Sequence, residues 1–201
     1  MEFVDPRKTP FVPVRWRGEL PHLYKPGCCY FATFRLADAI LYRPRGRSRA
    51  EPDAFEDPAE LLRDYDPPIT LGSCALSMPQ VAELTQRAIL HFNTARYELV
   101  SWCVMPNHVH VVFAPLVGNR VDEILHSWKG YTAREANRLL DRSGPFWERE
   151  SFDHLIRTAE AVERFSEYVE QNPVKAGLCA DAADWPYSSA GTGFQSPLGQ
   201  R

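Results

Sequence analysis

Residues 97–114, YELVSWCVMPNHVHVVFA, decide the fold of this 201-residue chain. Tyr97 to Met105 is rich in β-branched and aromatic residues, and His108 to Ala114 repeats that composition after a short turn at Pro106-Asn107. Two strands joined by so short a connection predict an antiparallel β-hairpin. The sequence therefore predicts a sheet that contains this hairpin.

One further strand and three helices are predicted around the hairpin. Gly27 to Leu36 alternates like a strand, and a helix should begin at Ser77 and run to Phe92. Apolar residues at helical spacing predict two more helices, Val121 to Leu140 and Ala159 to Gln171, the latter ended by Asn172-Pro173. The order strand, helix, hairpin, helix, helix indicates an α+β fold, an antiparallel sheet with helices packed on one face. Gly130 makes a bend or break in the second of these helices plausible.

The rest of the chain reads as additions to one domain. With 44% hydrophobic residues, the chain can bury one sizeable core. Residues 1–26 read as an irregular basic N-terminal arm, residues 43–70 as a charged, proline-rich insertion, and residues 174–201 as a C-terminal extension. The aromatic stretch around Trp185 in this extension is expected to pack back on the core.

Composition and charge narrow the classes of protein. No apolar run approaches the roughly 20 residues that span a bilayer, and residues 1–10 lack a secretory signal pattern, so we expect a cytoplasmic protein without membrane contact. The five cysteines lack the paired spacing of a zinc site. The net charge is −3, yet residues 1–50 carry ten Lys and Arg against four Asp and Glu. A basic loop there can be solvated or can bind a phosphate backbone, and it holds Arg43, Arg45, Arg47 and Arg49.

A pair of histidines is the strongest chemical feature. Side chains at positions i and i+2 of a strand point to the same face, so His108 and His110 should project together. Two imidazoles so placed can bind one divalent cation, or they can simply be two surface histidines. Val112 occupies the place of a third alternate histidine, which argues against a histidine-triad nucleotide hydrolase. The HExxH, P-loop, GxGxxG and GxSxG patterns do not occur in the sequence.

Tyr131 is the predicted nucleophile beside such a metal. A bound cation would favour negative charge on the attacking phenol oxygen. Glu135 lies four residues later, on the same helix face, and can supply an oxygen ligand to the same ion. Tyr131 can also be an ordinary boundary aromatic, and Glu135 a solvated charge paired with Arg134 or Arg138.

Several segments of the sequence resemble those of a known family. MPNHVHVVFAPL, WKGYTAREANRLL, GPFWERESFDHLIR, EQNPVKAGL and DWPYSSA are similar to segments of the single-tyrosine (Y1) HUH transposases, in the IS200-like and REP-associated tyrosine transposase subgroup. The matches run in order from residue 21 to about residue 190 and cover most of the chain.

The resemblance implies a ferredoxin-like fold with the histidines on a central strand. It implies that Tyr131 cuts single-stranded or hairpin DNA with Mg²⁺ or Mn²⁺, leaving a 5′-phosphotyrosine and a free 3′-OH. Family members carry Gln or Asn four residues after the tyrosine, where this chain has Glu135, so Glu135, Asn137 or water remains open as third ligand. Family members also occur as homodimers or monomers. The expected DNA contacts are Arg43, Arg45, Arg47, Arg49, Lys129, Arg134 and Arg138.

Three hypotheses follow from the sequence. The main one is a metal-dependent DNA-nicking and strand-transfer enzyme of the transposase type, acting at hairpin or repeat elements. The second is a domesticated, non-catalytic protein that binds DNA sequence-specifically. The third is a metal hydrolase of a small phosphodiester, in which Tyr131 is incidental. Formation of a covalent DNA adduct separates the first from the other two.

Overall fold

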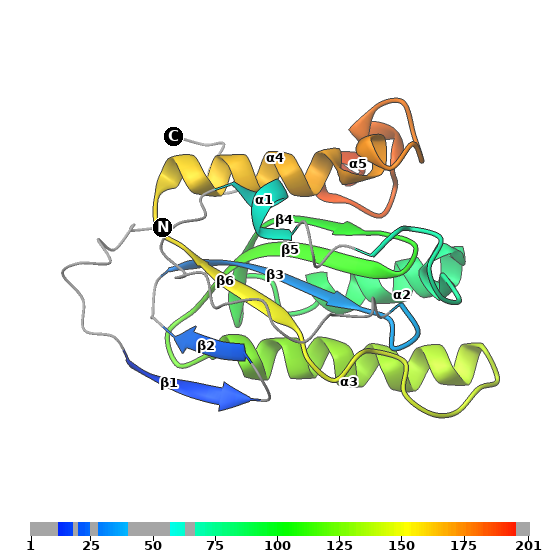
Figure 1. Cartoon of the computed structure of the whole chain (residues 1–201), viewed down its shortest axis with the longest axis horizontal. Helices are drawn as coiled ribbons and strands as arrows, with labels where there is room; N and C mark the ends of the chain where they lie inside the picture. The colour runs from blue at the N-terminus through cyan, green and yellow to red at the C-terminus, as the bar shows by residue number, and fades with distance from the viewer. Residues whose placement is uncertain (1–11, 18–19, 25–27, 40–56, 63–66, 196–201) are drawn as a thin grey trace.

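The computed structural model describes residues 12–17, 20–24, 28–39, 57–62 and 67–195. Its centre is a four-stranded antiparallel sheet in the order β4-β5-β3-β6 (Figure 1). These strands are β3 (Cys29–Arg35), β4 (Tyr97–Val104), β5 (His108–Pro115) and β6 (Phe152–Ile156). The predicted hairpin is β4–β5, which confirms it within one residue at each strand end.

Two helices complete a ferredoxin-like unit. In sequence, β3, α2 (Pro79–Leu90), β4, β5, α3 (Val121–Leu139) and β6 give the βαββαβ order of that fold. The predicted α+β class with an antiparallel sheet is therefore confirmed. Strand β6 is an edge strand that was not predicted from the sequence.

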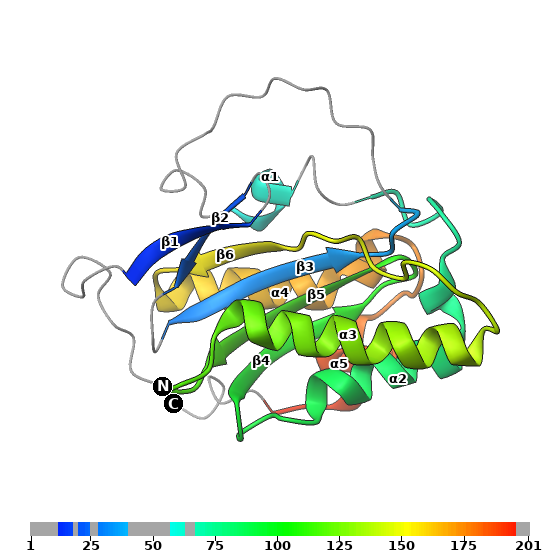
Figure 2. The same ribbon diagram turned by 90° about the horizontal axis from the view of Figure 1, so that it is seen from below.

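The helices cover both faces of the sheet, which corrects the expected packing on one face. Helices α2 and α3 pack on the face formed by Val109, Val111 and Phe113, whereas α4 (Ala159–Lys175) packs on the face that holds Val112. Figure 2 shows α3 and α2 on one side of the sheet and α4 on the other. The central strands β3 and β5 are buried on both faces, so both faces of the sheet need a cover. Helix α4 connects no two strands of the sheet and covers the second face.

Helix α3 runs without interruption through Gly130, so the predicted bend or break there is wrong. A Cβ built at Gly130 would meet no atom within 4 Å, which places the glycine on the open side of the helix. The buried side is fixed by Trp128, whose Nε1–H donates to Tyr97 Oη (2.9 Å), and by Thr132, which accepts from Trp147 Nε1–H (2.8 Å). These contacts hold the turns before and after the glycine against the core.

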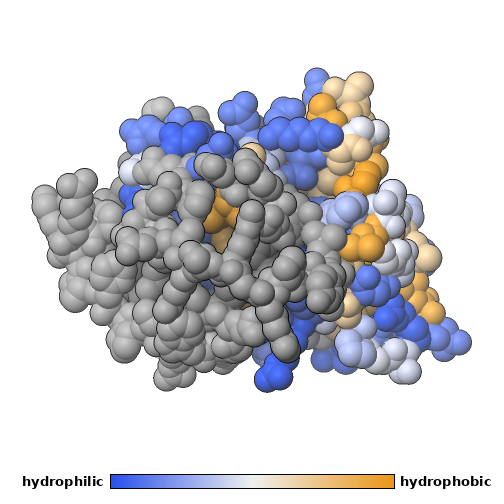
Figure 3. Space-filling model, viewed as in Figure 1, coloured by the Kyte–Doolittle hydropathy of each residue, from blue (hydrophilic) through white to orange (hydrophobic). Residues whose placement is uncertain are grey.

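Helix α4 continues past the point where the sequence predicted its end. Pro173 lies inside the helix, which ends at Lys175. Two hydrogen bonds close the end, Gly177 N–H donating to the Val174 carbonyl and Leu178 N–H to the Pro173 carbonyl. On its outer side α4 is hydrophilic, as the upper edge of Figure 3 shows.

The described ranges include parts of all three additions to the domain. Residues of the predicted irregular arm form a hairpin, β1 (Val12–Arg17) and β2 (Leu20–Tyr24), which corrects that interpretation. The insertion contains α1 (Pro58–Leu62). The C-terminal extension packs on the core as predicted, since Trp185 Nε1–H donates to the Val104 carbonyl at 3.0 Å. It includes the short α5 (Ser189–Thr192). None of the helices in the described ranges has the length and apolar character needed to cross a bilayer.

Candidate active site on the second face of the sheet

His108 and His110 project together from β5, as the strand periodicity predicts. They share a face with Val112, and both are almost fully buried. Their Nε2 atoms are 3.0 Å apart, and the His110 ring stacks on Phe31 with centroids 5.6 Å apart. Burial lowers the pKa of His110 to about 3, so its imidazole is neutral at physiological pH, the form that binds metals. The two rings therefore have the geometry of two metal ligands, and His110 is in the neutral form that such a ligand needs.

Helix α4 brings a tyrosine to this pair. The ring of Tyr168 lies 5.9 Å from that of His110, centroid to centroid, in an edge-on arrangement. The ammonium of Lys175 stands over the Tyr168 ring, 4.6 Å from its centroid. Asn172 follows Tyr168 by one helical turn and is buried. A phenol, a cation and an amide thus come from one helix to the face that holds the histidines.

Tyr131 lies on the other side of the sheet. It belongs to α3, whose buried residues pack against Val109, Val111 and Phe113 rather than against the histidine face. Its side chain is 45% exposed, and the Arg134 guanidinium sits 5.7 Å from its ring centroid. The expectation that Tyr131 stands beside the histidines of its own chain is therefore wrong. A helix that packs on one face of a sheet cannot deliver a side chain to the opposite face.

Glu135 is also away from the histidines. Its carboxylate accepts from Arg134 Nε (3.4 Å) and Arg138 Nε (3.2 Å), and these guanidinium groups lower its pKa, Arg138 the more strongly. Asn137, the alternative ligand, donates to the Gly144 carbonyl at 2.9 Å. Within the part of the chain that the structure describes, no three His, Cys, Asp or Glu side chains form a group suited to a metal ion. The predicted ligand set of His108, His110 and Glu135 is therefore not assembled.

The predicted DNA contacts fall into three situations. Arg43, Arg45, Arg47 and Arg49 lie outside the described residues. Arg134 and Arg138 are exposed and share Glu135, so they remain available at the surface. The Lys129 side chain instead donates hydrogen bonds within the protein.

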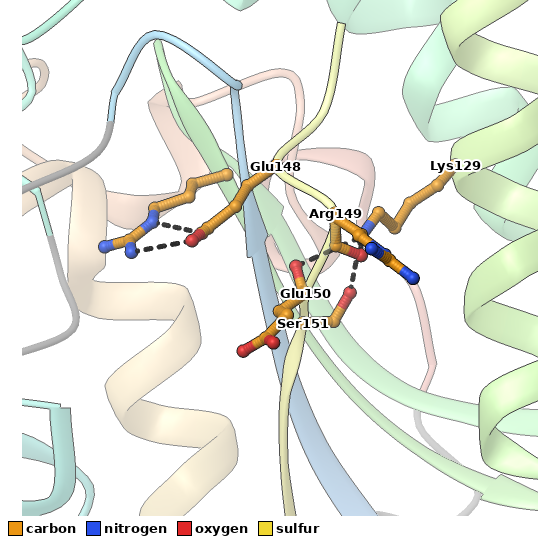
Figure 4. Close-up of polar contacts among 6 residues, drawn as sticks. Lys129, Glu148, Arg149, Glu150 and Ser151 are labelled. Carbon is orange, nitrogen blue, oxygen red and sulfur yellow. Dashed lines mark hydrogen bonds and ion pairs between the residues drawn. The ribbon is translucent and has the colours of Figure 1, made fainter. Parts of the chain in front are cut away.

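The Lys129 ammonium donates to three acceptors in the segment before β6, as Figure 4 shows. These are the carbonyls of Arg149 and Glu150, both at 3.1 Å, and Ser151 Oγ at 2.8 Å. An ammonium has three N–H donors, so the group is saturated. Burial lowers the pKa of Lys129 to about 8, whereas the carboxylates of Glu148 and Glu150 act in the opposite direction. The prediction that Lys129 contacts DNA phosphates is not compatible with this arrangement.

Arg35 adds a buried cation to the histidine face. It stands opposite His108 in the β3–β5 register and is 4% exposed. Its guanidinium forms a two-point ion pair with Glu148, Nε to Oε2 at 2.5 Å and Nη2 to Oε1 at 3.2 Å. The same short segment is therefore held from one side by Arg35 and from the other by Lys129.

A signal for Tyr168 was present in the sequence. Asn172 follows Tyr168 by four residues, the spacing at which the resembling family carries Gln or Asn after its tyrosine. Tyr131 has Glu135 at that place. In the sequence, Asn172 was interpreted only as the end of a helix and Tyr168 received no role, so the pair went unrecognised. Arg35 gave no signal, because a single arginine in a strand does not show that it is buried.

The fold agrees with that of known proteins, and part of the sequence matches a known family. The chain combines a ferredoxin-like sheet, paired histidines on a central strand and a tyrosine on the helix that covers them. Residues 80–172, which include the histidines and most of α4, match the family described as "Transposase IS200 like". The resemblance to IS200-like and REP-associated tyrosine transposases is confirmed.

Two curated relatives carry matching descriptions. The REP-associated tyrosine transposase of Escherichia coli is 24% identical over 108 residues, 53% of this chain and 63% of the relative. A candidate REP-associated tyrosine transposase of Haemophilus influenzae is 28% identical over 103 residues, 46% of this chain and 58% of the relative. The chain thus spans about six tenths of the length of these relatives.

A solved structure shares the fold. It is described as the REP-associated tyrosine transposase bound to a REP hairpin, and it aligns with a TM-score of 0.56 at 19% identity, covering 92% of each chain. At this identity the likeness establishes the α+β architecture alone.

Proposed function

We propose that this chain is a single-stranded DNA transesterase of the transposase type, with Tyr168 as its nucleophile. The observation that carries the proposal is the position of the Tyr168 ring, 5.9 Å from His110 on the face where both histidines are buried. The descriptions of the relatives support DNA as the substrate, and the REP hairpin bound by the solved neighbour favours a hairpin element.

The donor set fits a divalent metal. His108 and His110 would bind it through the two Nε2 atoms that already converge to 3.0 Å. The side-chain oxygen of Asn172, one turn from Tyr168 on α4, is the proposed third ligand in place of Glu135. Such a mixed N and O set accepts Mg²⁺ or Mn²⁺. When bound, the ion would polarise the scissile phosphate and neutralise charge that develops on its oxygens.

Tyr168 performs the bond exchange. Its Oη forms a bond to phosphorus while the bond from phosphorus to the 3′ oxygen breaks, leaving a 5′-phosphotyrosine and a free 3′-OH. The phenol proton is lost to solvent, and the departing 3′ oxygen takes one up, so protons balance. Lys175, whose ammonium lies over the phenol ring, places positive charge where negative charge develops. A later attack by a DNA 3′-OH on the phosphotyrosine reverses the step and rejoins strands.

Covalent trapping tests this assignment. The purified protein is incubated with labelled single-stranded oligonucleotides that contain repeat-type hairpins, with Mn²⁺, and adducts are resolved on a denaturing gel. We expect an adduct from the wild type, none from Tyr168→Phe, and a normal amount from Tyr131→Phe, which serves as the matched control. His110→Ala should also lose the adduct.

Other results of the trapping experiment would contradict specific parts of the proposal. An adduct that survives in Tyr168→Phe and disappears in Tyr131→Phe would overturn the assignment of the nucleophile. DNA binding without any adduct, across a broad set of hairpins, would favour the non-catalytic binding protein. Mass spectrometry of the trapped peptide identifies the modified residue directly, and we expect the α4 peptide that contains Tyr168.

A further inference from the structure

The side-chain amide of Asn107, in the turn between β4 and β5, has one defined orientation. It is 0% exposed, and its Nδ2 donates to two carbonyls, those of Pro68 and Leu71, each at 2.8 Å. Both N–H bonds of the amide are thereby used. Its orientation is fixed, because a flipped amide would point its oxygen at two carbonyl oxygens. The Oδ1 atom therefore faces away from the turn at residues 68–71.

That oxygen faces His108. The distance from Asn107 Oδ1 to His108 Nδ1 is 2.8 Å. An amide oxygen can only accept a hydrogen bond, so the proton of the His108 ring must reside on Nδ1. The lone pair then resides on Nε2, the atom that lies 3.0 Å from Nε2 of His110. Only one of the two tautomers of His108 is compatible with its surroundings.

We infer that Asn107 is a positioning residue that fixes the tautomer and ring orientation of His108 for metal binding. The inference rests on the proposed function in one respect, that the histidine pair binds a divalent ion. Metal-bound histidines commonly donate their second ring N–H to an oxygen that orients them and raises their basicity. Asn107 is suited to this role because its own amide is fixed by backbone atoms rather than by solvent.

The two ends of the amide have separable tasks. The NH₂ end anchors the turn, in which Leu71 N–H also donates to the Pro68 carbonyl at 2.9 Å. The turn continues to Gly72, which has φ +81° and packs so closely on Asp38 that a Cβ would lie 2.8 Å from the Asp38 carbonyl oxygen. The oxygen end serves His108. A substitution can therefore disturb one end and spare the other.

The first experiment needs no variant and no metal. Long-range ¹H–¹⁵N NMR of the metal-free wild type reports which ring nitrogen of His108 carries the proton. We expect the Nδ1–H tautomer. Finding the proton on Nε2 would overturn the inference, whether or not the protein binds metal or cuts DNA.

The second experiment separates the two ends through Mn²⁺ affinity, measured by calorimetry on the full chain. Asn107→Ala removes the acceptor and should weaken binding about 10- to 100-fold. Asn107→Asp keeps an oxygen toward His108 but loses both donors, so it should bind within about threefold of the wild type while unfolding at lower temperature. Gly72→Ala disturbs the turn and leaves the amide intact, and it should also stay within about threefold.

Equal losses in Asn107→Ala, Asn107→Asp and Gly72→Ala would show that the turn, rather than the oxygen, matters, and would overturn the inference. If the wild type binds no Mn²⁺ at all, the metal part of the proposed function fails. The NMR result then still decides the role of Asn107, so the two failures are distinguishable.

Discussion

Helices α3 and α4 present the same local motif on opposite faces of one sheet. Each has a buried apolar side, and each carries a tyrosine followed four residues later by a polar residue, Tyr131 with Glu135 and Tyr168 with Asn172. Only the α4 pair lies on the face of His108 and His110. The difference shows that the face a helix covers, and not the spacing of its residues, decides whether its tyrosine lies beside the histidines.

Mixing two variants that should each be inactive tests whether the histidines and the tyrosine of one site come from the same chain. Tyr168→Phe keeps the histidines, and His110→Ala keeps the tyrosine. Because Tyr168 lies over the histidines of its own chain, we expect the mixture to form no covalent DNA adduct, as neither protein holds a complete site. Denaturing gels of the mixture and of each variant alone provide the measurement.

Adduct formation by the mixture would contradict this expectation. Strong adduct formation by the mixture would mean that a tyrosine reaches the histidines of a second copy. Repeating the mixture with Tyr131→Phe added to the His110→Ala protein then shows whether α3 or α4 supplies that tyrosine. The wild type at the same total concentration is the reference for full activity.

The faces that α3 and α4 cover follow from how the chain connects the strands, more than from the local sequence pattern. Helices α2 and α3 each join parallel strands of the sheet, and the right-handed rule for such crossovers places both on one face. Helix α4 follows the edge strand β6 and joins no two strands, so it is free to cover the other face. Strand β6 was not predicted from the sequence, because Asp153 and His154 interrupt its short apolar run. Without β6, the face of α4 could not be assigned.

The histidine face was predictable because it depends on neighbouring residues alone. Alternation in β5 places His108 and His110 together whatever the rest of the chain does. Choosing between Tyr131 and Tyr168 requires knowing which helix crosses which face, and that depends on contacts between distant segments. The burial of Arg35 and the saturation of Lys129 depend on such contacts as well.

The packing of the two helices should be energetically similar. Trp128 of α3 is 2% exposed and Phe165 of α4 is 0% exposed. Replacing either by alanine leaves a large cavity, so each substitution should lower the free energy of unfolding by about 3–5 kcal/mol. Urea denaturation of the metal-free proteins measures both. A loss below about 1 kcal/mol for Phe165→Ala would mean that α4 is not docked, which removes Tyr168 from the site.

Acid should destabilise the α4 face specifically. Burial, with the nearby charge of Arg157, lowers the pKa of His154 to about 4, and its ring stacks on Phe165 of α4. Between pH 6.5 and about 4, the unfolded chain takes up a proton that the folded protein does not. Stability from this group is therefore complete above about pH 6.5 and falls by up to about 3 kcal/mol as the pH drops.

The variant His154→Phe isolates this effect. Its free energy of unfolding should fall less steeply than that of the wild type over the same pH range. His126→Phe is the matched control, because His126 is exposed on α3, and its pH dependence should follow the wild type. Parallel curves for wild type and His154→Phe would show that folding does not lower the pKa of His154, and would contradict the prediction.

The smallest expected effect concerns Glu135, the member of the α3 motif that the sequence placed at the metal. Its partners Arg134 and Arg138 have side chains 70% and 73% exposed, and exposed ion pairs contribute little to stability, so Glu135→Ala should leave the free energy of unfolding almost unchanged. Its Mn²⁺ affinity should equal that of the wild type, whereas Asn172→Ala should lose about tenfold or more, which corresponds to about 1.4 kcal/mol. If Glu135→Ala instead weakened Mn²⁺ binding and Asn172→Ala did not, α3 would have to supply a ligand from another copy of the chain. The two faces of the sheet would then be joined in one site by assembly rather than separated by the fold.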